Sequence, residues 1–558
     1  MTPFPAAVLA HVASNAPALA TGAIDYDLLL RGPLGQLDFY DSRQHLATVP
    51  GTVLAERARD RAGALAARGL GRGDRVLMVA ANSEDYLATL LAVLLLGAVP
   101  CAVAPPPTPS REDSAGVAHL RAAVRVVNPK LVLADPRTAA AVAHPGLVDY
   151  AELADGQSVS QLDLIPPLPS APHHIQLTSG STSAPKAVLL THGNVANNMA
   201  MIGHAIGTRR GLNRVFSWLP MYHDMGLIQV LGPLLYGAPI ALMTPLGFLR
   251  DPLSWPRHMT HHGSTFTAGP TFAYRAVADA LARAAGGAPE IDLASLRYAY
   301  VGAEPIPYAT LRHFTDTFAP VGLRSDVLIP CYGMAESVLA TTLALAPAPE
   351  GPGNFGRVRV LAGDDAHPAL VSCGPPIEGM RLSVVDSDGL EVSPGTVGEI
   401  RISGPSVMIG YRQPDGTLSP PPGGWHDTGD RGFVCDGELF VVGRSKEMLI
   451  IRGRNLPPYD VERTIEEFGD VGPGQAVVFC VPDTGGGAER VVAVLATGVN
   501  DPQRRAGLRA EVTTRVREVF GFSLDDVVLV AKTALPRTTS GKIQRLKVRE
   551  RYASDSPS

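Results

Sequence analysis

The stretch LTSGSTSAPKAVLLTH, at residues 177–192, combines a short loop of glycine and hydroxyl residues with a lysine, Lys186. Such a loop offers backbone N–H groups and hydroxyls to phosphate oxygens, and the ammonium group adds a point charge. It is not a Walker A loop, because the second glycine and the Lys-Ser/Thr pair are missing after Gly180. An ordinary surface turn is the alternative, so the loop alone predicts only a candidate phosphate site.

Helix-like and strand-like segments alternate on both sides of this loop. Apolar residues at helical spacing are typical of residues 51–70, 83–96 and 272–285. Short apolar runs that predict strands lie at residues 74–80, 130–134, 215–219, 239–243, 264–268 and 298–301. The alternation predicts an α/β fold with layers built on largely parallel sheets.

The pattern of predicted elements changes after a Pro/Gly-rich segment at residues 344–354. Short strands and turns follow, which predicts a β-rich, barrel-like subdomain at about 355–442. From about Lys446 onward, strands and a helix near 508–520 predict a separate small α+β domain, and YASDSPS at the end predicts a disordered tail. We therefore expect an N-terminal domain at 1–442 and a C-terminal domain at 448–558.

The bulk composition excludes several classes of protein. The net charge is −5 over 558 residues, so basic residues are not in excess and nucleic acid is not expected as a partner. Five scattered cysteines favour a reducing, cytoplasmic compartment, and the N-terminus lacks the basic residues of a signal peptide. The apolar run at 87–103 is interrupted by Thr89, Gly97 and Pro100, so we expect a buried helix and a strand rather than a membrane span.

Seven further motifs follow the 177–192 loop along the chain. They are SWLPMYHDMGLI (217–228), TAGPTFAYR (267–275), VGAEPIP (301–307), CYGMAES (331–337), GWHDTGDRG (424–432), VVGRSKEMLIIRGRNLPPYDVE (441–462) and LPRTTSGKIQR (535–545). Alone, each has a commoner structural explanation: a His-Asp hydrogen bond, a core tyrosine, a turn-forming aspartate, a solvated lysine. Together and in this order they resemble the adenylate-forming superfamily of acyl-CoA synthetases, peptide-synthetase adenylation domains and luciferases.

The resemblance implies a role for individual residues. Lys542 and His223 would be catalytic, Glu336 would hold Mg²⁺, and residues 443–447 would form a hinge between the two domains with Lys446 as its pivot. The acyl pocket would include Met225, Ile228, Gly269 and Pro270. The ATP or AMP contacts would come from Thr178, Ser179, Gly180, Ser181, Thr182, Lys186, Gly302, Ala303, Glu304, Tyr332, Gly333, Met334, Asp430 and Arg444.

The implied reaction is ATP-dependent activation of a carboxylic acid to an acyl adenylate, with release of pyrophosphate. TSGSTSAPK, PCYGMAES and LVSCGPP resemble the fatty acyl-AMP ligase branch, which carries an extra segment where residues 354–370 lie here. That branch implies a fatty acid substrate and transfer to the phosphopantetheine thiol of an acyl carrier protein. The alternatives are an acyl-CoA synthetase that uses free coenzyme A, an adenylation domain for amino acids, and a catalytically idle nucleotide-binding scaffold.

Overall fold

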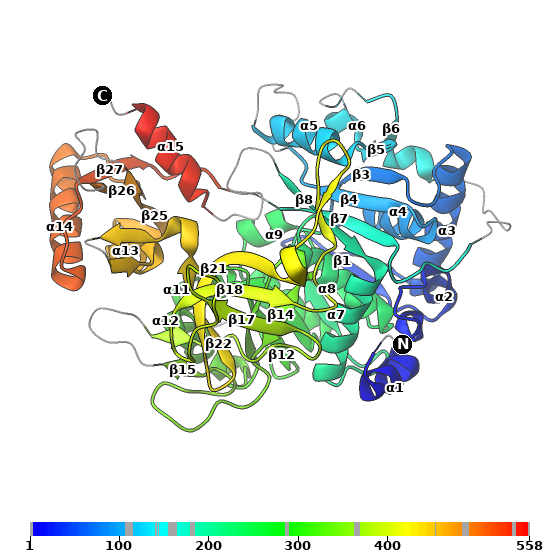
Figure 1. Ribbon diagram of the computed structural model, residues 1–558, viewed down its shortest axis with the longest axis horizontal. Helices are drawn as coiled ribbons and strands as arrows, with labels where there is room; N and C mark the ends of the chain where they lie inside the picture. Colours follow the sequence, from blue (N-terminus) through cyan, green and yellow to red (C-terminus); the bar gives the residue numbers. More distant parts are fainter. Residues whose placement is uncertain are drawn as a thin grey trace.

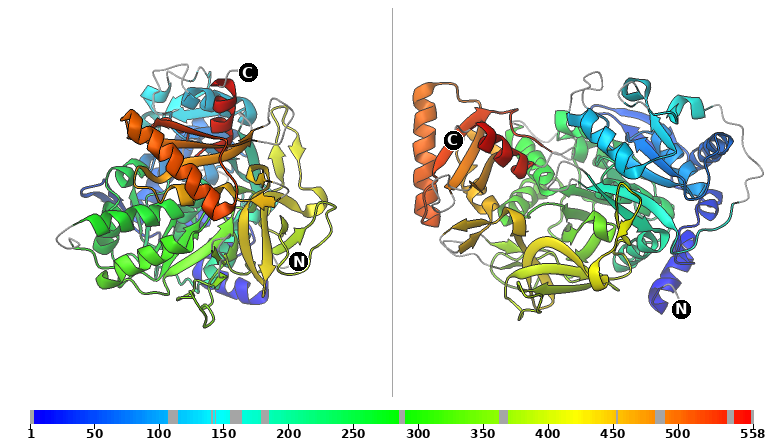
Figure 2. Two further views of the ribbon diagram at one scale, coloured as in Figure 1. Left: turned by 90° about the vertical axis from the view of Figure 1, so that its left-hand side faces the viewer. Right: turned by 45° about the horizontal axis from the view of Figure 1, so that its top comes forward.

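The computed structural model shows a large N-terminal body and a smaller C-terminal body beside it (Figure 1). It describes residues 4–106, 115–139, 142, 144–154, 164–178, 185–284, 290–361, 369–451, 454–481, 490–537 and 543–555. Separate clusters of buried apolar side chains fill the two bodies: those of the larger body come from elements before Arg444, and those of the smaller body begin at Leu449. The right-hand view of Figure 2 shows the same division. The chain therefore folds into a large N-terminal and a smaller C-terminal domain, as the sequence predicts.

Two eight-stranded sheets form the framework of the large domain. In the first, the interior strands are parallel and the edge strands β14 and β2 are antiparallel to their neighbours. Its order is β14 (Ala340–Leu343), β13 (Leu328–Gly333), β12 (Tyr298–Gly302), β11 (Phe266–Pro270), β9 (Val215–Ser217), β10 (Ile240–Met243), β1 (Leu37–Tyr40) and β2 (His45–Val49). The parallel interior confirms the α/β prediction.

The second sheet contains the 177–192 motif. Its order is β20 (Leu418–Ser419), β19 (Gly410–Arg412), β8 (Lys186–Thr191), β7 (Pro172–Thr178), β4 (Val99–Val103), β3 (Arg75–Val79), β5 (Leu131–Ala134) and β6 (Leu147–Asp149). The strands from β7 to β6 are parallel, whereas β8 folds back antiparallel on β7 and pairs with β19 on its other side. The motif is thus a hairpin at the place where the sheet changes from parallel to antiparallel.

Helices cover these sheets, and their ends follow local sequence signals. Ser83 caps α4 (Glu84–Leu95), every residue of which from Tyr86 onward is buried, and β4 follows as predicted. The remaining helices of this domain are α1 (Ala6–Asn15), α2 (Tyr26–Arg31), α3 (Gly51–Ala67), α5 (Ala115–Val127), α6 (Pro136–Ala139), α7 (His192–Ala205), α8 (Asp224–Leu235), α9 (Pro245–Arg250), α10 (Ser254–His262), α11 (Thr271–Arg283) and α12 (Tyr308–Phe318). Single-turn 3₁₀ helices are η1 (Pro17–Leu19), η2 (Tyr150–Leu153), η3 (Ala319–Val321), η4 (Ala335–Ser337), η5 (Pro422–Gly424) and η6 (Ser445–Glu447).

Among the helices of the described residues, none has the length and apolar character that crossing a membrane requires.

The β-rich region differs in detail from the predicted barrel-like subdomain. Its main unit is a four-stranded antiparallel sheet in the order β17 (Arg381–Val385), β18 (Gly398–Ser403), β21 (His426–Cys435) and β22 (Glu438–Arg444). Strands β19 and β20, which lie within the same stretch of sequence, instead extend the second large sheet. A short hairpin of β15 (Val360–Leu361) and β16 (Leu370–Val371) precedes the sheet. Pairing with β8 draws β19 away from the region, so the described strands form an open sheet.

The C-terminal domain is a three-stranded sheet covered by helices. The order is β25 (Val471–Val481), β26 (Arg490–Thr497) and β27 (Asp526–Ala531), beside a hairpin of β23 (Leu449–Ile451) and β24 (Arg454–Leu456). Its helices are α13 (Pro458–Ile465), α14 (Pro502–Phe520) and α15 (Arg545–Asp555). The prediction of a disordered tail from Tyr552 is wrong up to Asp555, because α15 continues that far and the Tyr552 hydroxyl donates a hydrogen bond to Asp526 at 2.8 Å.

Candidate functional site

The candidate phosphate loop is held at its base by the β7–β8 hairpin. Thr178 pairs with Lys186 across the hairpin, so the strand ends fix both ends of the loop. Ser179, Gly180, Ser181 and Thr182 lie outside the described residues. The Lys186 ammonium lies 4.8 Å from the centre of the Tyr411 ring on β19, and Tyr411 itself pairs with β8.

Tyr411 also connects this loop to the predicted metal carboxylate. Its hydroxyl donates to Oε1 of Glu336 at 2.6 Å, and the Glu336 side chain is almost fully enclosed. Glu336 lies on η4, and the chain leaves that turn through Val338 at a φ of 70°. A β-branched residue with positive φ is a strained conformation of the kind that gathers at functional sites.

Asp430 is the second buried carboxylate of the candidate site. Asp430 accepts a hydrogen bond from the Tyr332 hydroxyl at 2.8 Å and from Nε of Arg444 at 3.1 Å. Burial raises the pKa of the Asp430 carboxyl, and the Arg444 charge and the Tyr332 hydroxyl oppose that rise. Asp430 lies on a strand rather than in a turn, directly opposite Arg444 in the β21–β22 pair. Both side chains are therefore positioned by the sheet.

The predicted adenine-binding loops follow two neighbouring strands of the first sheet. Gly302 ends β12 and Gly333 ends β13, and these strands are parallel neighbours, so both loops emerge at one edge of the sheet. A Cβ at Gly302 would lie 2.8 Å from Cys331, so glycine is needed for this close approach. Met334 follows directly on Gly333.

Ala303 continues the Gly302 loop at a φ of 68°, a left-handed conformation that is uncommon for a residue with a side chain. The next residue, Glu304, accepts a hydrogen bond from the backbone N–H of Phe272 at 2.6 Å. That amide lies in the first turn of α11, where helical N–H groups have no partner within the helix. The contact joins this loop to the start of α11.

His223 is the N-cap residue of α8. Its loop is held by two buried side chains that sequence analysis missed. The side-chain amide of Asn82 donates to the carbonyls of Leu219 and Met243 at 2.9 Å, and that of Gln176 donates to the carbonyl of Tyr222 at 2.8 Å. Neither residue belongs to a motif, and only the structure reveals their role.

An apolar cavity extends from these loops between α7 and α8. Together with the part that is open to solvent, the cavity has a volume of about 1000 Å³. At one end it is lined by Asp224, Ala303, Tyr332 and Gly333, and at the other by Thr208, Asn213, Tyr236 and Ala238. The cavity therefore begins beside the candidate nucleotide loops and runs into the core.

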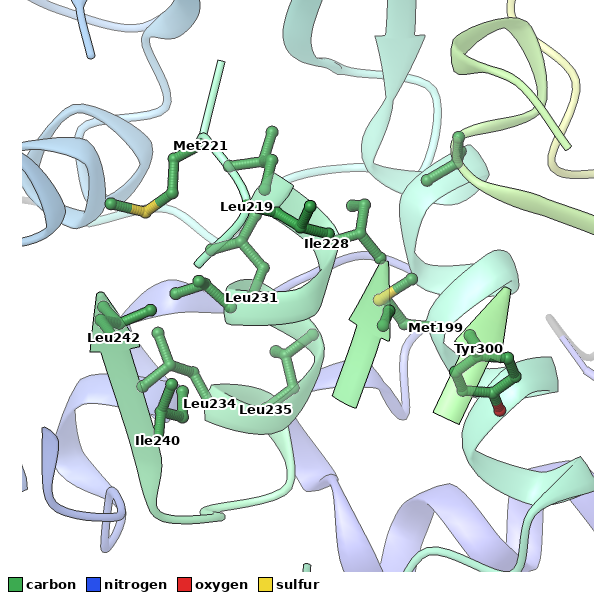
Figure 3. Close-up of a cluster of buried hydrophobic side chains, with 14 of the residues drawn as sticks. Met199, Leu219, Met221, Ile228, Leu231, Leu234, Leu235, Ile240, Leu242 and Tyr300 are labelled. Carbon is green, nitrogen blue, oxygen red and sulfur yellow. The ribbon is translucent and has the colours of Figure 1, made fainter. Parts of the chain in front are cut away.

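The spacing of the lining residues gives the cavity its length. On α8 they are Asp224, Met225, Ile228, Gln229, Gly232 and Pro233, followed by Tyr236, and on α7 they are Met199, Ile202 and Gly203, followed by Ile206. Both sets follow the helical period, so one face of each helix lines the cavity along its whole length. Figure 3 shows Ile228 of α8 on the side of Met199 and Tyr300, whereas Leu231 and Leu234 lie toward Ile240 and Leu242 of β10.

Two of the predicted acyl-pocket residues line this cavity and two do not. Met225 and Ile228 belong to its wall, but Gly269 and Pro270 do not. A Cβ at Gly269 would lie 3.0 Å from the Trp255 ring and 3.4 Å from that of Tyr274. Gly269 therefore packs close to two aromatic rings, and its assignment to the acyl pocket stays a prediction.

The C-terminal domain faces the same loops. Burial, and after it the Glu304 charge, raises the pKa of Tyr459, and burial lowers the pKa of Arg537 against the opposing charges of Glu466 and Glu304. Lys542 lies outside the described residues, but the segments that flank it are in place: Arg537 pairs with Ile543, and the Gln544 N–H donates to the Pro536 carbonyl at 2.9 Å. The described residues next to Lys542 thus belong to a face that looks toward the Gly302–Glu304 loop.

The predicted pivot, Lys446, is exposed on η6 between the two domains. Its neighbour Glu447 pairs with Arg545, which also donates from Nε and Nη2 to the Glu462 carboxylate of α13 at 2.7 to 3.1 Å. Sequence analysis missed this ion cluster, because Arg545 lies in a different motif from Glu447 and Glu462 and far from both along the chain.

Comparison with known proteins agrees with the fold and the site. The family model described as AMP-binding enzyme matches residues 52–412, and the model described as Disco-interacting protein 2-like, AMP domain, matches residues 446–557. The long-chain-fatty-acid–AMP ligase FadD23 of Mycobacterium tuberculosis is 32% identical over 86% of this chain and 86% of its own length. The 4-hydroxyphenylalkanoate adenylyltransferase of Mycobacterium marinum is 32% identical over 88% of this chain and 83% of its own.

A solved structure from a study of the fatty acyl-adenylate ligases of E. coli and L. pneumophila is also similar. It has a TM-score of 0.85 and 28% identity, and the match covers 99% of both chains. The fold is that of a two-domain enzyme that forms adenylates from ATP. This chain belongs to the AMP-binding enzyme family.

Proposed function

We propose that this enzyme activates a carboxylic acid with a long apolar body, such as a fatty acid, and passes the acyl group to an acyl carrier protein. One observation carries the proposal: the apolar cavity between α7 and α8 opens beside Ala303, Tyr332 and Gly333, so an extended acyl chain in it would present its carboxylate to the nucleotide loops. The names of the fatty acid–AMP ligase relatives support this substrate class.

In the first step a carboxylate oxygen attacks the α-phosphorus of ATP, the bond to the β-phosphate oxygen breaks, and pyrophosphate leaves. A carboxylate is already ionised at neutral pH, so no general base is required. Catalysis then depends on positioning and on cations that offset the negative charge. We assign Lys542 to the acyl carboxylate and α-phosphate, Asp430 to the ribose hydroxyls, and Arg444 to the ribose or α-phosphate. His223 orients the carboxylate at the mouth of the cavity.

The phosphates of ATP lie, in this proposal, against Thr178, Lys186 and the loop between them. Mg²⁺ is usually held by one or two carboxylates together with phosphate oxygens and waters. Glu336 fits that pattern: the described residues contain no group of three or more metal-ligating side chains, and this single carboxylate is enclosed and oriented by Tyr411. The bound ion would offset phosphate charge.

In the second step a thiol sulfur attacks the acyl carbon, a thioester forms, and AMP leaves. We propose that the C-terminal domain, residues 448–558, turns about residues 443–447 with Lys446 as the pivot, so that Lys542 withdraws and the thiol enters. The exposed position of Lys446 supports a pivot there, because a hinge needs a few residues at an element end that can change backbone conformation.

The acceptor that we propose is the phosphopantetheine thiol of a carrier protein. Residues 354–370, the extra segment of the carrier-protein branch, begin and end in described structure around β15 and β16, and residues 362–368 lie outside it. A relative named putative fatty-acid–CoA ligase FadD25 is 33% identical, so free coenzyme A is the alternative acceptor. Cys101, Cys331, Cys373 and Cys435 are free thiols, which supports a reducing, cytoplasmic location.

The experiment is ATP–pyrophosphate exchange across a panel of acids, followed by acyl transfer to a phosphopantetheinylated carrier protein or to free coenzyme A. We expect exchange with long apolar acids and transfer to the carrier protein. Exchange with amino acids only would contradict the substrate class, and thioester formation with coenzyme A alone would contradict the acceptor. A protein that binds ATP but gives no exchange with any acid would be an idle nucleotide-binding scaffold.

A further inference from the structure

The deep end of the α7–α8 cavity contains a polar group without a partner. The Tyr236 side chain is 3% exposed, and its hydroxyl has no hydrogen-bond partner among the described residues. Buried hydroxyls almost always have a partner, so an unpaired one needs an explanation such as a ligand. The His11 ring lies 5.9 Å from the Tyr236 ring between ring centres, and the buried Nε2 of His11 is also unpaired among the described residues.

The position of this hydroxyl follows from the glycine opposite. Gly203 belongs to the face of α7 that lines the cavity, so a side chain there would project toward α8. A Cβ at Gly203 would lie 2.0 Å from the Tyr236 hydroxyl oxygen. The hydroxyl therefore occupies the space between the two helices that the missing side chain leaves free, in the wall of the cavity.

Other polar residues surround the same end. Thr208 and Asn213 line the cavity there and are each 7% exposed, and one long contact of 3.4 Å joins the Asn213 amide to the Thr208 hydroxyl. Farther along the wall, Gln229 is different, because both ends of its amide are used by Ser217 and Phe216. The deep end thus offers hydrogen-bonding capacity that the protein itself does not fill.

The distance from the nucleotide end is set by α8. Asp224 lines the cavity beside the nucleotide loops, and Tyr236 follows twelve residues later. At 1.5 Å per helical residue, the two positions are about 18 Å apart along the helix axis. A group that reaches Tyr236 is therefore at the far end of the acyl chain from the carboxylate.

We propose that the acid this enzyme activates carries a hydroxyl or carbonyl oxygen at its far end, and that the Tyr236 hydroxyl donates a hydrogen bond to that oxygen. This inference rests on the adenylation proposed above and adds the substrate class. A chain that ends in a methyl group leaves the buried hydroxyl unpaired, and a site built for a hydrogen bond discriminates against a ligand that lacks the partner.

Tyr300 provides a matched control. It also lines the cavity and its hydroxyl is also unpaired, but Figure 3 shows that hydroxyl pointing away from Met199 and Ile228. Tyr236→Phe and Tyr300→Phe therefore remove the same atom from the same kind of environment, but only Tyr236→Phe is expected to change the choice of substrate.

The test compares kcat/KM for pyrophosphate exchange between straight-chain acids and their ω-hydroxy counterparts over a series of chain lengths. We expect the wild type to prefer the ω-hydroxy acid about tenfold to hundredfold at the length that reaches Tyr236. Tyr236→Phe should lose that preference, and Tyr300→Phe should keep it. Equal selectivity in the wild type and Tyr236→Phe, or a wild-type preference for the methyl-ended acid at every length, would overturn the inference.

The melting temperature of the substrate-free protein is a second readout. Because the Tyr236 hydroxyl has no partner in the protein, Tyr236→Phe should leave the melting temperature unchanged or raise it. A marked fall would reveal a protein partner for the hydroxyl and overturn the premise. Absence of exchange with every acid would contradict the proposed adenylation, whereas exchange without the preference would overturn this inference alone.

Discussion

Replacing Arg545 by methionine should destabilise the C-terminal domain strongly. Arg545 donates to both carboxylate oxygens of Glu462 and also pairs with Glu447. Glu462 is only 5% exposed, so the substitution leaves a buried carboxylate without its counter-charge. Breaking a buried ion pair from one side costs about 3 to 5 kcal/mol.

The stability of the Arg545→Met variant should depend on pH, and the direction of this dependence follows from the pKa of Glu462. Burial raises the pKa of Glu462, and the Arg545 charge opposes that rise. Without Arg545, the folded-state pKa lies still higher above its unfolded value, so the folded variant retains a proton that the unfolded chain releases. The stability of the variant should therefore be highest below the unfolded pKa of about 4.5 and fall as pH rises toward the folded pKa.

Thermal and urea unfolding measured between pH 5 and pH 8 would test this. Arg545→Met with Glu462→Gln should recover much of the lost stability, because it removes the unpaired charge. Arg504 is the control: it pairs with Asp470 and Glu511 in the same domain but is 42% exposed, so Arg504→Met should cost about 1 kcal/mol or less. Equal losses for Arg504→Met and Arg545→Met, or no pH dependence, would refute the reasoning.

Three further substitutions test other parts of the account. In exchange kinetics, Asp430→Asn should raise the KM for ATP about tenfold to hundredfold and leave the KM for the acid unchanged, because in the proposed assignment the ribose loses a charged acceptor. Ile228→Trp should narrow the cavity and shift exchange about tenfold toward shorter acids. Burial lowers the pKa of His174 to about 3 and of His192 to about 4, so both stay neutral when folded and stability should fall as pH drops from 6.5 toward 4, by about 1.4 kcal/mol per unit for each group. His174→Asn should reduce this slope in thermal unfolding, and an unchanged slope would contradict the assignment.

Patterns of local sequence predicted the framework well. The apolar periods of α3 and α4 and the short runs that form β3, β5, β10 and β12 were all assigned correctly, because burial in layered sheets leaves a clear period. The β-rich region was predicted less well. Nothing near Tyr411 indicates that β19 pairs with β8, more than 200 residues earlier, since such pairing depends on tertiary contacts.

The motifs located the loops around His223 and Glu336, but not the side chains that hold them. Tyr411 and Asn82 act through contacts over long sequence separations, which a single sequence does not display. The cavity wall on α7 was missed for another reason. Its residues from Met199 to Ile206 have helical spacing, but a cavity-lining face and a core-packing face have the same apolar pattern.

The most direct test of the central claim is the formation of acyl adenylate by the full-length chain and by Lys542→Ala. Each protein is incubated with ATP, Mg²⁺ and an acid but no thiol, and acyl-AMP is quantified by mass spectrometry while ATP binding is measured by calorimetry. The account predicts acyl-AMP from the wild type, and at least about 100-fold less from Lys542→Ala with ATP affinity nearly unchanged. Acyl-AMP formation by Lys542→Ala at the wild-type rate, or none from the wild type with any acid, would contradict it.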